Sequence, residues 1–350
     1  MNGNRAVTRE LLHRLPKTDL HLHLDGSLRP QTMLELADRV GIELPVTDAA
    51  ALAQYMHVSD GRDLVDYLAR FEATLALMQT ADAIERIAYE LAEDCALENI
   101  RYAEIRFCPA LNTRGGMSNQ EVVEAALSGL RRAEADHEIM TAVIVCGLRN
   151  LPLATSIDMA TLAVAFRDRG VVAFDLAGAE RGNPPIDHQP AFQIAADANM
   201  AITIHAGEAF GPASIHQAIH YCNARRIGHG TRLWEDPDLM DYVNDFRIPI
   251  EICLTSNVQT RAATSLEEHP LRLFYDQGLV VTLNTDNRLM SATTMTDEFL
   301  RAHQALGFTW DELCELAMMG FESAFLPYQE KSALLEAIRT EVDAARATPG

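Results

Sequence analysis

Histidine and carboxylate side chains end or directly follow several short apolar runs of this sequence. Two histidines alternate with leucine in the first run, and later runs end in further histidines, a glutamate and an aspartate; these residues are His21, His23, His205, Glu208, His229 and Asp286. Imidazole nitrogens and carboxylate oxygens bind catalytic metals and transfer protons in enzymes. The pattern therefore predicts a metal-dependent active site.

The alternation of His21 and His23 places two imidazoles on one side of a strand. Successive side chains of a strand point to opposite faces, so these two project the same way, about 7 Å apart. Together with His205 and Asp286 they form the predicted ligand set. Three imidazoles and one carboxylate suit Zn²⁺, although nickel, cobalt and iron accept similar ligands. A catalytic zinc keeps one position open for a water, whose pKa it lowers to roughly 7.

Two further residues are candidates for proton transfer or for orienting hydroxide near that metal. Glu208 follows His205 by three positions, which places it near the metal without requiring it to be a ligand. We expect Glu208 to shuttle protons; the alternative is a carboxylate that stabilises the start of a helix. We expect His229 to orient the attacking hydroxide, either as a hydrogen-bond donor or as an acceptor.

These residues need a framework that brings distant segments together. Eight short runs rich in Val, Ile, Leu and Ala recur at residues 19–24, 102–108, 142–147, 171–177, 201–206, 226–230, 248–254 and 279–283. Helical patterns lie between them at residues 119–138, 155–169, 186–199, 214–224, 236–245 and 269–277. Strands alternating with helices predict parallel α/β units, and this number of units predicts a (β/α)₈ TIM barrel with its active site at the carboxyl ends of the strands. An open doubly wound sheet is the competing architecture.

Two helical regions exceed a minimal barrel. Residues 49–99 are expected to form a helical lid insertion after the first strand, in which Leu64, Leu68, Phe71 and Leu75 share one face. Residues 295–345 are expected to form C-terminal helices. Because no linker or low-complexity tract interrupts the chain, residues 1–350 are interpreted as a single domain.

The composition narrows the range of partners. The formal net charge of −21 disfavours a nucleic acid polymer and suits a small neutral or cationic substrate. The six cysteines are scattered, as expected for reduced thiols of a cytoplasmic protein. We find neither a secretory signal nor a run of roughly 18 apolar residues, and therefore expect no membrane segment. The sequence does not indicate an oligomeric state.

A two-metal centre is the alternative to a single ion. Barrel hydrolases of that kind usually need a bridging carboxylated lysine on a middle strand. Residues 171–178 contain no lysine, so one metal ion is favoured.

These motifs resemble those of the adenosine deaminase family. They are His21-Leu22-His23-Leu24-Asp25-Gly26, His205-Ala206-Gly207-Glu208, Gly228-His229-Gly230 and Asn284-Thr285-Asp286. Leu254-Thr255-Ser256-Asn257 and Ala324-Phe325-Leu326 are similar to bacterial members, and the resemblance runs from about residue 15 to residue 331. It implies zinc-dependent hydrolytic deamination of adenosine and 2′-deoxyadenosine to inosine and 2′-deoxyinosine, with release of ammonia.

The resemblance also implies a role for each site residue. It implies that zinc is held by His21, His23, His205 and Asp286. Glu208 would protonate purine N1, while His229 and Asp286 orient the attack on C6. The backbone N–H of Gly178 would meet purine N3, and Asp25 would lie near the ribose 5′-hydroxyl. An apolar lid around Tyr67, Leu68 and Phe71 would keep the site dry.

The sequence departs from the family pattern at two positions. Asn287 stands where the family usually has a second aspartate that reaches purine N7, and Cys108 stands where a serine is common. An aspartate must be protonated to donate to N7, whereas an asparagine amide donates without taking up a proton. We therefore interpret Asn287 as a functional substitute.

Other substrates and classes of protein are alternatives. An adenine or other 6-aminopurine deaminase is the main one, but adenine deaminases tend to carry glutamate at the position of Asp25, and the shorter aspartate leaves room for ribose. AMP would need cations near the strand ends, where no basic cluster is found. A nucleoside-binding protein without catalysis would lack a ligand or Glu208. A hydrolase of non-purine substrates would lack the intact purine-site motifs.

Overall fold

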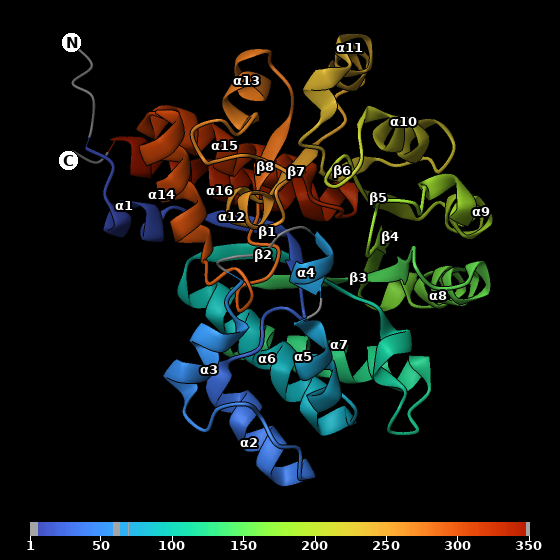
Figure 1. Ribbon diagram of the computed structural model, residues 1–350. Helices are drawn as coiled ribbons and strands as arrows, with labels where there is room; N and C mark the ends of the chain where they lie inside the picture. Colours follow the sequence, from blue (N-terminus) through green and yellow to red (C-terminus); the bar gives the residue numbers. More distant parts are fainter. Residues whose placement is uncertain (1–5, 59–63, 69, 348–350) are drawn as a thin grey trace.

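The strands form one parallel sheet in sequence order. The computed structural model describes residues 6–58, 64–68 and 70–347. Its strands are β1 (Lys17–His23), β2 (Ile100–Phe107), β3 (Met140–Leu148), β4 (Val171–Ala177), β5 (Ala201–Ala206), β6 (Arg226–His229), β7 (Ile250–Ile252) and β8 (Val281–Leu283). Neighbouring strands pair in parallel in the order β1-β2-β3-β4-β5-β6-β7-β8 (Figure 1). This order excludes the doubly wound sheet, in which the strand order reverses.

The last strand meets the first through Asp286, just beyond β8. The Asp286 N–H donates to the carbonyl of His21 at 2.8 Å, and the Asp286 carbonyl accepts from the N–H of His23 at 2.7 Å. The side-chain oxygen of Asn284 also accepts from the N–H of Leu20 at 2.9 Å. These bonds join β8 to β1, so the prediction of a (β/α)₈ TIM barrel is confirmed.

Helices surround the barrel as a (β/α)₈ fold requires. Those between successive strands are α6 (Ala81–Leu97), α7 (Asn119–Asp136), α8 (Leu153–Ala165), α9 (Gln189–Asp197), α10 (Pro212–His220), α11 (Pro237–Asp245), and the pair α12 (Leu254–Gln259) and α13 (Leu271–Asp276). Short 3₁₀ turns are η1 (Pro109–Asn112), η2 (Arg167–Arg169), η3 (Pro185–His188) and η4 (Leu233–Glu235).

Within the residues that the structure describes, no helix is both long and apolar enough to cross a bilayer.

The C-terminal helices cover the seam where β8 meets β1. They are α14 (Met295–Leu306), α15 (Trp310–Ser323) and α16 (Tyr328–Ala347). Helix α15 packs against β8 and β1, and α1 (Arg9–Arg14) packs against α14. The close approach of α15 requires a glycine, because a Cβ on Gly320 would lie 2.1 Å from Oγ1 of Thr18.

The segment after β1 consists of several short helices. They are α2 (Pro30–Val40), α3 (Ala49–Met56), α4 (Leu64–Leu68) and α5 (Phe71–Leu77). The expected insertion over residues 49–99 also includes α6, which packs against β2 and α7, and residues 59–63 and 69, which lie outside the described residues. Leu64, Leu68, Phe71 and Leu75 belong to two helices, α4 and α5, instead of one (Figure 1). All four line the same pocket.

Strand boundaries follow the predicted apolar runs closely. β4 and β5 have the predicted bounds. β7 is shorter than the predicted run of residues 248–254, because Leu254 already begins α12. The apolar pattern alone does not distinguish the end of a buried strand from the first turn of a buried helix.

Candidate active site

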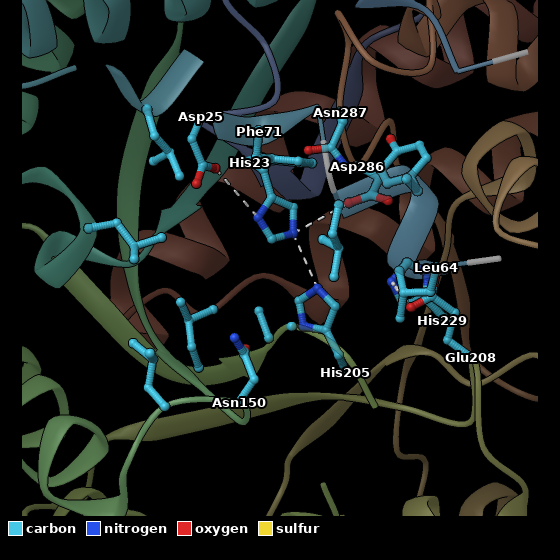
Figure 2. Close-up of a pocket in the computed structure, with 18 residues that line it drawn as sticks. His23, Asp25, Leu64, Phe71, Asn150, His205, Glu208, His229, Asp286 and Asn287 are labelled. Atoms are coloured by element: carbon cyan, nitrogen blue, oxygen red, sulfur yellow. Dashed lines mark hydrogen bonds and ion pairs between the residues drawn. The ribbon is translucent and has the colours of Figure 1, made fainter. Parts of the chain in front are cut away.

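A pocket lies at the carboxyl ends of the strands, beneath α4 and α5. Its lining includes these predicted site residues: His23, Asp25, Leu68, Phe71, Gly178, His205, Glu208, His229, Asp286 and Asn287. His21 is buried beside them, with its ring centre 4.4 Å from that of His205. The structure thus brings the predicted site residues together from the ends of five strands and from the lid helices. Figure 2 shows His23 in the middle, between Asp25, His205 and Asp286.

The four predicted metal ligands converge on one point of this pocket. His23 Nε2 lies 3.2 Å from His205 Nε2 and 3.3 Å from Asp286 Oδ1. His21 Nε2 lies 3.5 Å from the same Asp286 oxygen. His229 is also near, because one nitrogen or oxygen from each of His21, His205, His229 and Asp286 lies within 4.8 Å of the others.

This arrangement fits a divalent cation. The buried His21 Nε2 has no hydrogen-bond partner among the described residues, and the facing nitrogens of His23 and His205 can share only one proton. Burial lowers the pKa of His21 to about 4 and that of His23 well below its usual value, which favours the neutral imidazoles that bind metals. Burial alone would raise the pKa of Asp286, but His21 and His23 hold it well below its usual range. A cation at this point would satisfy all four side chains.

Buried carboxylates hold two of the imidazoles from behind. His21 Nδ1 donates to Glu251 Oε2 at 2.8 Å, and His205 Nδ1 donates to Asp175 Oδ2 at 3.0 Å. With the proton on Nδ1, each ring directs the lone pair of Nε2 toward the pocket. Arg106 lies between the two carboxylates and donates to Asp175 and to Glu251, each at 2.9 Å.

A second arginine completes this buried network. Arg226 donates to Glu251 at 2.6 Å and also contacts Glu104. Burial would raise the pKa of Glu251, but the charges of Arg106 and Arg226 hold it well below its usual value. Glu251 therefore remains ionised and can keep accepting from His21.

Asp286 and His229 have left-handed backbone conformations, with φ of 60° and 64°. Residues with a Cβ adopt this region rarely, because it costs on the order of 1 kcal/mol or more. Asp286 is held by its backbone bonds to β1 and by Ser256, whose hydroxyl donates to Asp286 Oδ2 at 2.5 Å. The surrounding structure thus stabilises a strained conformation at two residues of the pocket.

Glu208 lies beside His229 in the pocket wall. Its Oε2 is 3.7 Å from His229 Nε2. Burial raises the pKa of Glu208 above its usual value, which favours the protonated acid. The alternative of a helix-start carboxylate is not supported, because α10 begins at Pro212 and has no acidic residue in its first turn.

The loop that carries Glu208 is held by Glu180, which the sequence analysis did not identify. The Glu180 carboxylate accepts from the backbone N–H groups of Gly207, Glu208, Ala209 and Phe210 at 2.7, 3.0, 2.6 and 2.8 Å. Glu180 is itself buried. Four hydrogen bonds to one side chain fix the path of this loop.

Two predicted substrate contacts, Asp25 and Asn287, have unpartnered oxygen atoms. Oδ1 of Asp25 and Oδ1 of Asn287 are buried and have no hydrogen-bond partner among the described residues. Burial raises the pKa of Asp25 to about 7. Asn287 packs directly on Gly26, where a Cβ would lie 1.8 Å from Asn287 Oδ1. Gly178 has a φ of 95°, which a residue with a Cβ would adopt only with strain.

Apolar side chains cover the pocket. Those from α4 and α5 are Leu64, Tyr67, Leu68, Phe71 and Leu75. The hydroxyl of Tyr67 is hydrogen-bonded to Ser291 Oγ at 2.8 Å, which ties α4 to the segment after β8. This cover limits the access of water to the polar groups below.

Known proteins are similar to this chain in both sequence and fold. A profile of the adenosine deaminase family matches residues 16–341. An adenosine deaminase of Mycobacterium sp. (strain JLS) is 44% identical over 348 residues, which cover 94% of this chain and 96% of the relative. The structure of an adenine deaminase from Arthrobacter aurescens has a TM-score of 0.87 at 29% identity and covers 94% of this chain and 99% of its own. A Burkholderia ambifaria amidohydrolase with bound zinc has a TM-score of 0.88 at 25% identity, with coverage of 99% and 96%.

The barrel and the histidine–aspartate cluster at its mouth define an amidohydrolase-type enzyme whose cluster can hold a divalent metal ion. Within this class, the chain belongs to the adenosine deaminase family. The family predicted from the motifs is therefore confirmed.

We predict that Glu180→Gln loosens the loop over residues 207–210. A glutamine offers one acceptor oxygen, and its amide nitrogen would face backbone N–H groups that need acceptors. The free energy of unfolding should fall by about 1–3 kcal/mol, and hydrogen exchange of these four amides should accelerate. The exposed Glu336→Gln serves as the control and should change neither measurement. Unaltered exchange at residues 207–210 in Glu180→Gln would contradict the role of Glu180.

Proposed function

We propose that this protein hydrolyses adenosine and 2′-deoxyadenosine to inosine and 2′-deoxyinosine, with release of ammonia. The observation that carries the proposal is the position of Glu208, a buried acid with a raised pKa, in one pocket with the metal-binding cluster. Hydrolysis at a carbon of an aromatic ring needs a proton for the ring and an activated water at that carbon. The acid and the cluster can supply these two requirements side by side.

We infer that the metal is a single Zn²⁺ held by His21, His23, His205 and Asp286. Three imidazoles and one carboxylate suit zinc, and zinc is bound in the similar Burkholderia ambifaria structure. When bound, zinc would lower the pKa of a water molecule so that hydroxide forms near neutral pH.

The protein groups divide the proton transfers between them. Protonated Glu208 donates to purine N1, which makes C6 more electrophilic. His21 and His23 hold the pKa of Asp286 low, so its carboxylate is ionised and can accept a hydrogen bond from the attacking water. His229 contacts the same water through its ring and orients it toward C6.

The remaining contacts select a purine nucleoside. In this proposal the backbone N–H of Gly178 donates to N3, the amide of Asn287 donates to N7, and Asp25 binds the ribose 5′-hydroxyl. Leu68 and Phe71 cover the base. Support comes from the unpartnered Oδ1 of Asp25 and from the pocket lining, which includes Gly178, Asn287 and apolar side chains.

Two other substrates fit the pocket less well. Among the described residues, its lining contains no lysine or arginine, so the phosphate of AMP would lack a cation. Adenine or another 6-aminopurine is the main alternative, because an adenine deaminase shares the fold. Asp25 favours the nucleoside, since its short side chain leaves space for ribose. Cys108 lies outside the described pocket lining, and burial raises the pKa of its thiol to about 12, so we assign it no role.

The partner in this proposal is thus a small molecule, and we infer neither a nucleic acid polymer nor a membrane as a partner. A cytoplasmic location agrees with the six cysteines, all of which are free and buried. Both the location and the interpretation of residues 1–350 as one domain stay predictions.

A purine panel tests the substrate. Ammonia release is measured with adenosine, 2′-deoxyadenosine, adenine and AMP at equal concentration, together with metal analysis of the purified protein. We expect about one zinc per chain and faster turnover of both nucleosides, because only they use the contact with Asp25. Faster turnover of adenine than of adenosine would reject the nucleoside assignment.

Two variants separate the acid from the metal site. Glu208→Gln should retain zinc but lose about 100- to 10,000-fold in kcat, because glutamine cannot transfer a proton to N1. Asp286→Ala should lose both zinc and activity, because it removes a ligand. Near-parental kcat in Glu208→Gln would exclude Glu208 from the mechanism, and full zinc content in Asp286→Ala would exclude Asp286 as a ligand.

Asn287→Asp tests the contact with N7. The new carboxyl can donate only while it is protonated, so activity of the variant should fall as pH rises through the pKa of that carboxyl. The parent amide has no such requirement. The measurement is kcat/KM for adenosine from acidic to alkaline pH, and parallel profiles for the two proteins would argue against the N7 assignment.

A further inference from the structure

A line of buried hydrogen bonds leads from a backbone amide to His229. It begins at Leu271, whose N–H donates to His269 Nδ1 at 3.1 Å. A backbone N–H can only donate, so His269 Nδ1 carries no proton and the ring proton lies on Nε2. Burial lowers the pKa of His269 to about 3, which keeps the ring neutral. His269 Nε2 is therefore a donor.

This donor sets the orientation of Asn257. His269 Nε2 donates to Asn257 Oδ1 at 3.1 Å, so the amide nitrogen of Asn257 faces His229 Nδ1, at 2.9 Å. An amide nitrogen donates and does not accept, so Nδ1 of His229 must accept. A His229 ring with one proton then carries it on Nε2, which faces the pocket 3.7 Å from Glu208 Oε2.

The reverse arrangement would place donors against donors. A proton on His229 Nδ1 would require Asn257 to turn its oxygen toward that nitrogen, so that the Asn257 amide nitrogen would face His269 Nε2. The His269 proton would then have to lie on Nδ1, against the N–H of Leu271. His229, Asn257 and His269 are all buried, so water cannot relieve the conflict.

We propose that Asn257 and His269 are positioning residues that fix His229 in the tautomer with its proton on Nε2. The proposal rests on the proposed function, in which His229 contacts the attacking water. An Nε2–H group can hold the oxygen of that water by donating to it, but it cannot accept its proton. Of the two roles that the sequence leaves open for His229, the structure assigns that of donor.

Nitrogen NMR of the zinc-loaded protein tests the tautomer without any substrate. With ¹⁵N-labelled histidine, the rings of His229 and His269 are assigned from the signals missing in His229→Gln and His269→Gln. We expect a protonated Nε2 and an unprotonated Nδ1 in both rings at neutral pH. A proton on His229 Nδ1, or two tautomers in comparable amounts, would overturn the proposal. Because no turnover is measured, this result is independent of whether adenosine is the substrate.

Asn257→Asp tests whether Asn257 imposes the tautomer. A carboxylate only accepts, so it should bring a proton onto His229 Nδ1, and the signal of that nitrogen should change to the protonated form. Asn223→Asp makes the same substitution at an exposed position and should leave both rings unaltered. An unprotonated His229 Nδ1 in the Asn257→Asp protein would contradict the proposal.

Two variants of His269 distinguish positioning from packing. Phenylalanine fills the space of the ring but cannot donate to Asn257, whereas the amide of glutamine can. We expect kcat to fall about 10- to 100-fold in His269→Phe with KM and zinc content near the parent values, and His269→Gln to recover part of the loss. Equal losses in both variants, or loss of zinc from either, would reject the positioning role.

Discussion

The position of Arg106 between two buried carboxylates is the contact on which the site depends. Its guanidinium donates to Asp175 and to Glu251 in the interior of the barrel. Ionised carboxylates are strongly destabilising in such surroundings unless a cation pairs with them. Because each carboxylate also accepts from an imidazole, Arg106 indirectly directs the free nitrogens of His21 and His205 toward the pocket. Contacts in the interior of the barrel therefore fix the orientation of the metal-binding nitrogens at its mouth.

The bonds that close the barrel lie at the same place. A closed barrel needs a complete ring of hydrogen bonds between strands, and the last link runs between the backbone of Asp286 and that of His21 and His23. The side chains of these three residues are predicted metal ligands. Their relative positions thus follow from backbone pairing, and they cannot separate without opening the seam. The fold and the site share these hydrogen bonds.

The sequence predicted the residues that line the pocket better than those that support them. The ligands were predictable because each ends or follows an apolar run, and the carboxyl ends of barrel strands meet on one face. Glu251 and Asp175 are visible as charges within the apolar strands β7 and β4, but their partners depend on the register of neighbouring strands, which a local pattern does not encode. Glu180 and Asn257 reach their hydrogen-bond partners because connecting segments follow particular paths. Tertiary packing determines those paths. Residues 49–99 were predicted as one helical insertion, whereas the structure has several helices there. Each of these helices has its own apolar face, so the apolar pattern did not show where one helix ends and the next begins.

The left-handed backbone of His229 and Asp286 explains why so much supporting structure is needed. Each conformation costs on the order of 1–3 kcal/mol and persists only where surrounding contacts determine it. Asp286 has the seam and Ser256, and His229 has the hydrogen bond from Asn257. These contacts orient the polar groups before a substrate arrives. Groups that are already oriented need no rearrangement when charge develops on the reacting atoms, and this preorganisation is the main source of electrostatic catalysis. The local strain and the catalytic arrangement are thus consequences of the same contacts.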